Sequence, residues 1–216
     1  MIQAAVFDMD GTMVNTEHLW GDVMRRLAER YGKTFDEGVR VLTMGKRDYD
    51  SLSVFRDFFS IDVPVEELIT VRQAMVLEDL SMVEANPGLF ELLALLERLS
   101  IKKAVATSSF PAFTERILSR FELVPRFDAV VTGGEVPRGK PFPDIFIEAA
   151  RRISVPPENC LVLEDAQNGV EAAAAASMRV VAIPHDASRT HDFSKAHRVI
   201  ASMREIDEAF LREIAA

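Results

Sequence analysis

Short apolar runs recur along this chain of 216 residues, and each is followed by small or acidic residues. The runs are Ala4 to Phe7, Lys103 to Ala106, Ala129 to Val131, Cys160 to Leu163 and Arg179 to Ile183. Continuous runs of this kind are typical of strands buried on both faces of a parallel sheet. Stretches with helical spacing lie between them, at residues 89–99, 111–121, 144–153 and 170–176. The alternation predicts an α/β fold with a doubly wound parallel sheet.

Residues 17–84 break this alternation, because they show helical spacing and no strand pattern. The apolar residues with that spacing are Leu19, Val23, Met24, Leu27 and Tyr31, which fit one face of an amphipathic helix. The turn sequence at residues 86–88, Asn-Pro-Gly, marks the return of the chain to the main domain. We therefore expect an α/β core domain from residues 1–16 and 85–216 and an inserted all-helical cap domain from residues 17–84.

The composition limits the possible partners and the compartment. A net charge of −9 argues against nucleic acid as a partner, because binding a phosphate backbone needs clustered Lys and Arg. The chain has one cysteine, Cys160, so it can form no intrachain disulfide, which fits a reducing cytoplasm. We see neither a secretory signal nor an apolar run long enough to cross a membrane, and we expect no membrane partner.

Two carboxylates follow the first apolar run. Val6 and Phe7 lead directly into Asp8, and Asp10 comes two residues later, before a glycine. Ligands of open α/β sheets bind at the carboxyl ends of the strands, and this is such an end. Two acids placed there repel each other unless a cation or a proton intervenes, and Mg²⁺ with its oxygen ligands is the natural cation. A solvated acidic turn is the alternative for a single motif of this kind.

A second strand end delivers another pair of acids. The apolar run that begins at Cys160 ends directly at Glu164 and Asp165. If the two strands are neighbours in the sheet, the two pairs converge and can hold one metal ion beside one reacting group. Two such pairs in one chain make unrelated acidic loops a poor explanation.

Two further strand ends offer groups that bind phosphate. Thr107 and Ser108 follow a predicted strand, where hydroxyl and backbone N–H groups can contact phosphate oxygens. Lys140 lies in a turn before a proline, from which its ammonium can reach developing negative charge. Each signal is weak when taken alone, because a Ser/Thr run is usually a helix cap and such a lysine usually lies in a solvated loop.

The order of these motifs resembles the haloacid dehalogenase-like superfamily. The motifs are Asp-x-Asp-Gly-Thr from Asp8, Thr107-Ser108, Gly-Lys-Pro around Lys140, and Glu164-Asp165-Ala166. The resemblance covers the whole chain and is closest to the branch with a helical cap that includes β-phosphoglucomutase and the pseudouridine-5'-phosphatase-like proteins. It implies a Mg²⁺-dependent phosphatase that acts on a small phosphorylated metabolite such as a sugar phosphate or a nucleoside monophosphate-like compound. We expect a cytoplasmic protein from the cysteine count, and a monomer because the insert supplies the lid within the chain.

The resemblance also implies a role for each residue of the motifs. Asp8 attacks phosphorus and forms an aspartyl-phosphate, while Asp10 gives a proton to the leaving oxygen and later takes one from water. Lys140 neutralises charge on Asp8 and on the phosphate. Thr107 or Ser108 binds the transferring phosphoryl group. The implied metal ligands are Asp8, the backbone carbonyl of Asp10, Glu164 and Asp165, the last being the stronger candidate.

Outside the motifs, Gly45 and Lys46 lie in a predicted cap loop that could close over the substrate, and we expect them to contact it. A solvated turn is the alternative for this loop. His185, His191 and His197 lack the spacing of metal ligands, and we expect them on the surface.

Other activities within the superfamily stay open at this stage. A phosphosugar mutase is one alternative, although Trp20 and Asp48 stand where the mutases carry a histidine and an arginine. A phosphonate-cleaving enzyme would use a cap lysine as a Schiff base, and Lys46 is more simply a polar contact. A third alternative is a non-catalytic protein that binds a phosphometabolite, against which the intact set of Asp8, Asp10, Lys140 and Asp165 argues.

Overall fold

A computed structural model describes residues 1–215, apart from the side chain of residue 41. Its main element is a six-stranded sheet with the strand order β5-β4-β1-β6-β7-β8, in which all neighbours are parallel. The strands are β1 (Ala4–Phe7), β4 (Lys102–Thr107), β5 (Ala129–Thr132), β6 (Cys160–Glu164), β7 (Arg179–Ala182) and β8 (Arg198–Val199). The predicted doubly wound α/β core is confirmed, and only the two-residue strand β8 lacked a signal in the sequence.

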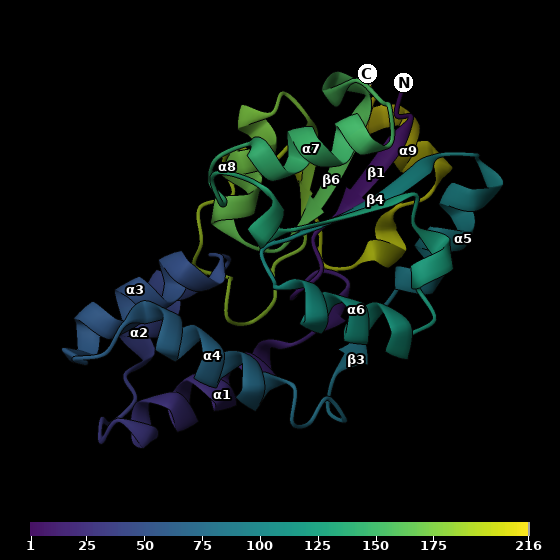
Figure 1. The fold of residues 1–216 in the computed structure, drawn as a ribbon. Helices are drawn as coiled ribbons and strands as arrows, with labels where there is room; N and C mark the ends of the chain where they lie inside the picture. The colour runs from purple at the N-terminus through teal and green to yellow at the C-terminus, as the bar shows by residue number, and fades with distance from the viewer. Residues whose placement is uncertain (216) are drawn as a thin grey trace.

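Helices cover both faces of this sheet (Figure 1). One face packs against α5 (Leu89–Arg98), α6 (Pro111–Arg120) and α9 (Glu208–Ile214), and the other against α7 (Asp144–Arg152) and α8 (Gln167–Ala175). Alternate residues of each strand enter the two apolar clusters, as with Phe7 on the first face and Val6 on the second. The strands are therefore apolar throughout because both of their faces are buried.

Four helices lie within residues 17–84 and form a separate apolar cluster. They are α1 (Glu17–Arg30), α2 (Glu37–Thr43), α3 (Asp48–Phe59) and α4 (Val65–Val76). Leu27, Leu52, Phe55 and Leu68, from three of these helices, are fully buried in the cluster. In Figure 1 the four helices stand beyond the carboxyl ends of the sheet strands. We propose that this segment is the cap domain and that residues 1–16 and 85–216 are the core domain.

The chain passes between these two parts through a short antiparallel pair of strands. β2 (Val14–Asn15) leaves the loop after β1, and β3 (Glu84–Ala85) returns beside it. Asn86 follows β3, and its Nδ2 donates hydrogen bonds to the carbonyl oxygens of Gly11 at 2.6 Å and of Thr12 at 2.8 Å. The returning strand is thus tied directly to the acidic loop that follows β1.

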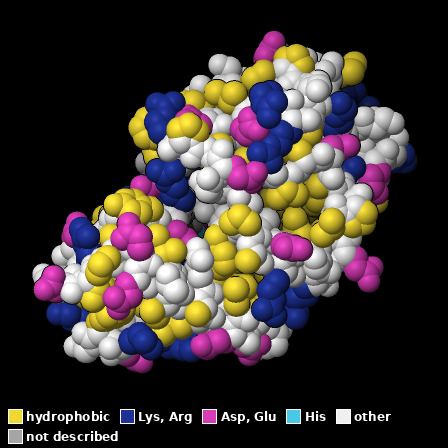
Figure 2. All heavy atoms as spheres, viewed as in Figure 1, with side chains coloured by type: hydrophobic (Ala, Val, Ile, Leu, Met, Phe, Trp, Pro, Cys, Tyr) yellow, Lys and Arg dark blue, Asp and Glu magenta, His cyan; other side chains and the backbone are white. Residues whose placement is uncertain are grey.

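The surface of the molecule mixes charges of both signs. Figure 2 shows Lys and Arg interspersed with Asp and Glu on one face, without a large region of positive charge there. No helix in the described part of the chain is long and apolar enough to cross a membrane.

We expect Asn86→Ala to lower the free energy of unfolding by about 1–3 kcal/mol, because two carbonyl oxygens of the acidic loop lose their donor. Urea denaturation would measure the change. Asn15→Ala is the matched control in the partner strand, since Asn15 is exposed and its side chain makes no hydrogen bond with the described residues; its effect should stay within about 0.5 kcal/mol. Equal effects of the two substitutions would show that the hydrogen bonds of Asn86 contribute nothing to the free energy of unfolding.

Candidate active site

The acidic pairs converge because their strands are neighbours in the sheet. β1 pairs with β6 and with β4, so that Phe7 lies opposite Leu163 on one side and Val105 on the other. Asp8 comes directly after β1, and Glu164 and Asp165 come at the end of β6. All three carboxylate residues are almost fully buried, with 6%, 1% and 4% of their surface exposed.

A buried lysine lies between two of these carboxylates. Nζ of Lys140 is 2.5 Å from Oδ1 of Asp8 and 2.6 Å from Oε1 of Glu164, and it also donates to the carbonyl of Ala106 at 3.3 Å. Its ammonium lies 5.0 Å from the ring centre of Phe146. Burial alone would lower the pKa of Lys140, but the negative charges of Asp8 and Glu164 raise it, so the side chain stays protonated.

Glu164 has a partner for each of its oxygens. Oε1 faces Lys140, and Oε2 accepts hydrogen bonds from the backbone N–H groups of Asp165 at 2.9 Å and Ala166 at 2.8 Å, at the start of α8. Gly169, one turn into α8, makes room for this carboxylate, since a Cβ at Gly169 would lie 1.6 Å from Oε1 of Glu164. Glu164 therefore faces Lys140 and the helix end, and its predicted role as a metal ligand stays a prediction.

Asp165 is held by two side chains. Its Oδ1 accepts a hydrogen bond from Oγ1 of Thr12 at 3.0 Å, and its Oδ2 lies 2.9 Å from Nε2 of His185. Burial raises the pKa of Asp165 to about 6, with the bond to His185 opposing and the charge of Glu164 adding to the rise. The expectation that His185 lies on the surface is wrong, because it is half-buried and contacts Asp165.

Asp10 points toward four donors in the core and at the base of the cap. Its Oδ1 accepts hydrogen bonds from Oγ1 of Thr16 and Nε1 of Trp20, both at 2.8 Å. Its Oδ2 accepts from Oγ of Ser109 at 2.7 Å and from Oγ1 of Thr107 at 3.4 Å. Sequence reasoning missed Ser109 and Trp20 in this role, and only the position of Ser109 after a strand end could have indicated it.

The predicted cap loop lies directly against the core. Oγ of Ser108 donates a hydrogen bond to the carbonyl of Gly45 at 3.0 Å, and Nδ2 of Asn168 donates to the carbonyl of Met44 at 3.2 Å. Nη1 of Arg47 donates a hydrogen bond to the carbonyl of Pro137 at 3.0 Å, and Pro137 belongs to the loop that carries Lys140. The structure therefore brings Gly45 to the end of β4, where the predicted phosphate-binding hydroxyls lie.

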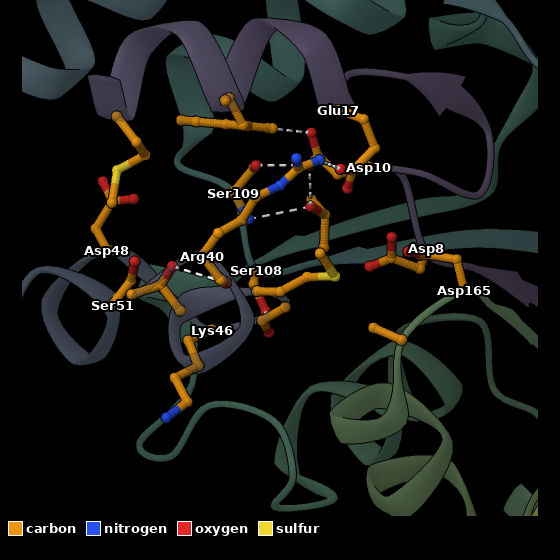
Figure 3. A pocket seen from close by; sticks show the side chains of 18 of the residues that line it. Asp8, Asp10, Glu17, Arg40, Lys46, Asp48, Ser51, Ser108, Ser109 and Asp165 are labelled. Carbon is orange, nitrogen blue, oxygen red and sulfur yellow. Dashed lines mark hydrogen bonds and ion pairs between the residues drawn. The ribbon is translucent and has the colours of Figure 1, made fainter. Parts of the chain in front are cut away.

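The four carboxylate residues and the hydroxyl residues after β4 line one cavity between the cap helices and the core, with a volume of about 120 Å³. In Figure 3 Asp8 and Asp165 lie side by side at one end, and Asp48 and Ser51 of α3 lie at the other. Lys46 also lines the cavity, but its side chain extends away from the two aspartates (Figure 3). The side chain of Lys46 is thus directed away from the end of the cavity where Asp8 and Asp165 lie.

The far end of the cavity contains a buried arginine. Arg72 of α4 pairs with Asp48 and donates from Nη1 to Oγ of Ser51 at 3.2 Å. Its guanidinium carbon lies 5.3 Å from the ring centre of Trp20. Charge and hydroxyl groups therefore line the wall opposite Asp8, beside the aromatic surface of Trp20.

The charges near Asp8 fit a divalent cation. Asp8, Glu164 and Asp165 would together carry three negative charges when ionised, and Lys140 supplies one positive charge, which leaves two of these three uncompensated before Asp10 is counted. Burial raises the pKa of Asp8 well above its ordinary value; Lys140 opposes this rise, while the nearby carboxylates of Glu164, Asp165 and Asp10 add to it. Within residues 1–215 no cluster of three acid, histidine or cysteine side chains is arranged around a single point. Mg²⁺ suits such a site, because it is usually held by one or two carboxylates together with water and substrate phosphate.

Known proteins are similar to this chain in fold and in sequence. The family model described as haloacid dehalogenase-like hydrolase matches residues 2–177. The "Phosphorylated carbohydrates phosphatase" of Thermotoga maritima is 34% identical, over 85% of this chain and 86% of its own length. The "Probable pseudouridine-5'-phosphatase" of Drosophila melanogaster is 34% identical, over 93% of this chain and 89% of its own.

A longer relative and a solved structure complete the comparison. The chain spans 53% of the length of the Arabidopsis thaliana bifunctional riboflavin kinase/FMN phosphatase, to which it is 32% identical over 93% of its own residues. The crystal structure of CbbY from Rhodobacter sphaeroides, in complex with phosphate, superposes with a TM-score of 0.89 at 28% identity, covering 98% of this chain and 100% of that chain.

In the metal-free protein, we expect Asp165 to make stability fall as the pH rises. Its pKa is about 6 when folded, against an ordinary value of 3.8, so the folded state holds the proton more tightly than the unfolded state between these values. The free energy of unfolding therefore drops across that window, by up to about 3 kcal/mol from this group. Urea denaturation in EDTA near pH 4 and near pH 7 would measure the drop.

Asp165→Asn cannot ionise and should lack this contribution, whereas Asp22→Asn, at an exposed position on α1, should retain it. The same pH dependence in Asp165→Asn and in the wild type would contradict the assignment.

Gly169→Ala should destabilise the protein by about 1–3 kcal/mol or more, because the added methyl overlaps the carboxylate of Glu164. Gly21→Ala is the matched control on helix α1, since a Cβ there meets no atom within 4 Å. It should stabilise the protein by about 0.5–1 kcal/mol. Thermal unfolding of the two variants would show shifts of opposite sign, and a neutral Gly169→Ala would mean that Glu164 occupies another position.

Proposed function

This chain belongs to the haloacid dehalogenase-like hydrolases as a phosphoric monoester hydrolase, and we propose that it is a Mg²⁺-dependent phosphatase acting through an aspartyl-phosphate on Asp8. The family that the four motifs predicted is confirmed. The observation that carries the proposal is the buried Asp8 carboxylate, held by Lys140 beside Asp165 at one end of a cavity. The proposed substrate is a small phosphorylated metabolite, a sugar phosphate or a nucleoside monophosphate-like compound, in keeping with the names of the relatives.

The metal would be held by Asp8 and Asp165, with the Asp10 carbonyl and Glu164 as the further ligands expected from the sequence. When bound, Mg²⁺ would neutralise negative charge on the phosphoryl group and on the carboxylates. The two uncompensated charges of the site and the raised pKa of Asp8 support this assignment.

In the first step, one oxygen of Asp8 attacks phosphorus, and the bond from phosphorus to the ester oxygen breaks. The leaving oxygen takes a proton from Asp10, so that the products are the alcohol and phospho-Asp8. Both oxygens of Asp10 accept hydrogen bonds from Thr16, Trp20, Ser109 and Thr107, and one oxygen has to leave these donors before Asp10 can donate a proton. The hydrogen bonds around Asp10 thus define its resting position.

In the second step, water attacks phosphorus and loses a proton to Asp10, and the bond from phosphorus to Asp8 breaks. Inorganic phosphate leaves, and both aspartates return to their starting states. Lys140 stays protonated throughout and neutralises charge on Asp8 and on the phosphoryl oxygens. Hydroxyl groups of Thr107 and Ser108 are the proposed donors to the phosphoryl group.

The cap loop would exclude water while these steps proceed. Gly45 and Arg47 already contact the core in this structure, at the end of β4 and at the loop of Lys140. Closure of this kind strengthens the electrostatic interactions inside the site. All of the proposed groups come from one chain, so we propose that the enzyme works as a monomer.

We expect Asp8→Asn to abolish phosphate release from p-nitrophenyl phosphate and from a panel of phosphorylated metabolites, because an amide cannot act as the nucleophile. Asp10→Asn should lower kcat by about 10²–10⁴. A colorimetric phosphate assay with Mg²⁺ or with EDTA would measure both, and mass spectrometry would detect the phosphoryl group on the Asp10→Asn protein.

Asp22→Asn serves as the control for this test, since Asp22 is exposed on α1 and lies outside the cavity. Turnover that survives in Asp8→Asn, or that needs no Mg²⁺, would contradict the proposal. Formation of an isomeric phosphate ester without release of inorganic phosphate would identify a mutase instead.

A further inference from the structure

A chain of polar side chains connects the cap with Asp165. Arg40 of α2 pairs with Glu17, the first residue of α1. Oε1 of Glu17 lies 3.3 Å from Nε2 of His185, and the same nitrogen lies 2.9 Å from Oδ2 of Asp165. Figure 3 shows Arg40 extending toward Glu17 on the cap side of the cavity. The proposed catalytic steps use neither His185, Glu17 nor Arg40.

The ring of His185 is fixed by the backbone. The N–H of Ala187 donates a hydrogen bond to Nδ1 of His185 at 3.2 Å. Because Nδ1 accepts this bond, the neutral ring carries its proton on Nε2, and that N–H faces Asp165 and Glu17. His185 therefore acts as a donor toward one oxygen of Asp165, while Thr12 donates to the other.

The contact between His185 and Asp165 is closely packed by the loop after β1. Gly11 has φ of +79°, and a Cβ there would lie 2.5 Å from Oδ2 of Asp165 and 3.0 Å from Nε2 of His185. The loop after β1 therefore packs against the contact between Asp165 and His185, and a side chain at position 11 would disrupt it.

We infer that His185 is a positioning residue for Asp165, and that Glu17 and Arg40 link this positioning to the cap. The inference rests on the proposed function, since it takes Asp165 as a ligand of the metal. A ligating carboxylate needs hydrogen bonds that fix its orientation, and removing such a partner typically weakens metal binding. His185 and Thr12 are the side chains that supply these bonds to Asp165.

The link to the cap follows from the position of Glu17. It lies at the junction of β2 and α1, and its other partner, Arg40, belongs to α2. Glu17 and Arg40 also line a second, larger cleft of about 880 Å³, so that they stand between this cleft and the active-site cavity. A shift of α1 and α2 moves the carboxylate that shares the N–H of His185 with Asp165. By linkage, cap position and metal affinity must then influence each other by the same factor.

Isothermal titration of Mg²⁺ into the full chain tests the positioning role without any turnover. His185→Ala should raise the Kd for Mg²⁺ about 10–100-fold, because Asp165 loses one of its two donors. His185→Gln should restore most of the affinity, since its amide N–H can reach the same oxygen. His18→Ala is the matched control, as His18 is exposed one residue after Glu17 and should bind Mg²⁺ like the wild type.

A double-mutant cycle tests the link to the cap. Glu17→Gln should change the Kd for Mg²⁺ in the wild-type background and have little effect in the His185→Ala background, because the two residues act through one hydrogen bond. Fluorescence of Trp20, the single tryptophan, would report whether Mg²⁺ shifts the start of α1 less in Glu17→Gln. Additive effects on the Kd would overturn the link.

The outcomes separate this inference from the proposed function. An unchanged or lower Kd in folded His185→Ala, with normal Mg²⁺ binding by the wild type, would overturn the positioning role alone. Absence of Mg²⁺ binding by the wild type would overturn the metal site itself. Thermal melts in EDTA would establish that each variant is folded.

Discussion

The ammonium of Lys140, placed between the carboxylates of Asp8 and Glu164, is the interaction on which the site depends. Three acids are buried at adjacent strand ends, and without a counter-charge their burial would strongly favour their neutral forms. When the three acids are ionised, Lys140 neutralises one of their negative charges and leaves two uncompensated. With its carboxylates ionised, the site would therefore keep the negative charge that the proposed metal ion needs.

The parallel sheet makes this concentration of charge possible. Strands β4, β1 and β6 are neighbours, so residues that are far apart in the sequence arrive at one edge with matched register. Glu164 connects the charge cluster to the fold as well, since it also accepts hydrogen bonds from the N–H groups of Asp165 and Ala166, which come directly before α8. The helix end and the lysine thus share one carboxylate, and the packing of α8 and the electrostatics of the site depend on each other.

The sequence predicted the parts of this arrangement that depend on a repeated pattern. Buried strands leave continuous apolar runs, and acids at the ends of two such runs indicated where the carboxylates converge. Contacts made by single side chains left no such pattern. His185 contacts Asp165 from a loop after β7, and Ser109 and Trp20 contact Asp10 from different elements. These roles depend on distances in space, which the spacing of residues along the sequence does not give. The direction of Lys46 was unpredictable for the same reason, because a loop has no fixed side-chain period.

The contact between Ser108 and Gly45 sets up a competition. A hydroxyl carries one proton, and in this structure Ser108 gives it to a carbonyl of the cap loop. In the proposed reaction, a phosphoryl oxygen that accepts this hydrogen bond would displace the carbonyl and free the loop from one of its contacts with the core. The carbonyl of Gly45 would therefore compete with phosphate for the hydroxyl of Ser108, and it would recover the hydrogen bond each time phosphate departs.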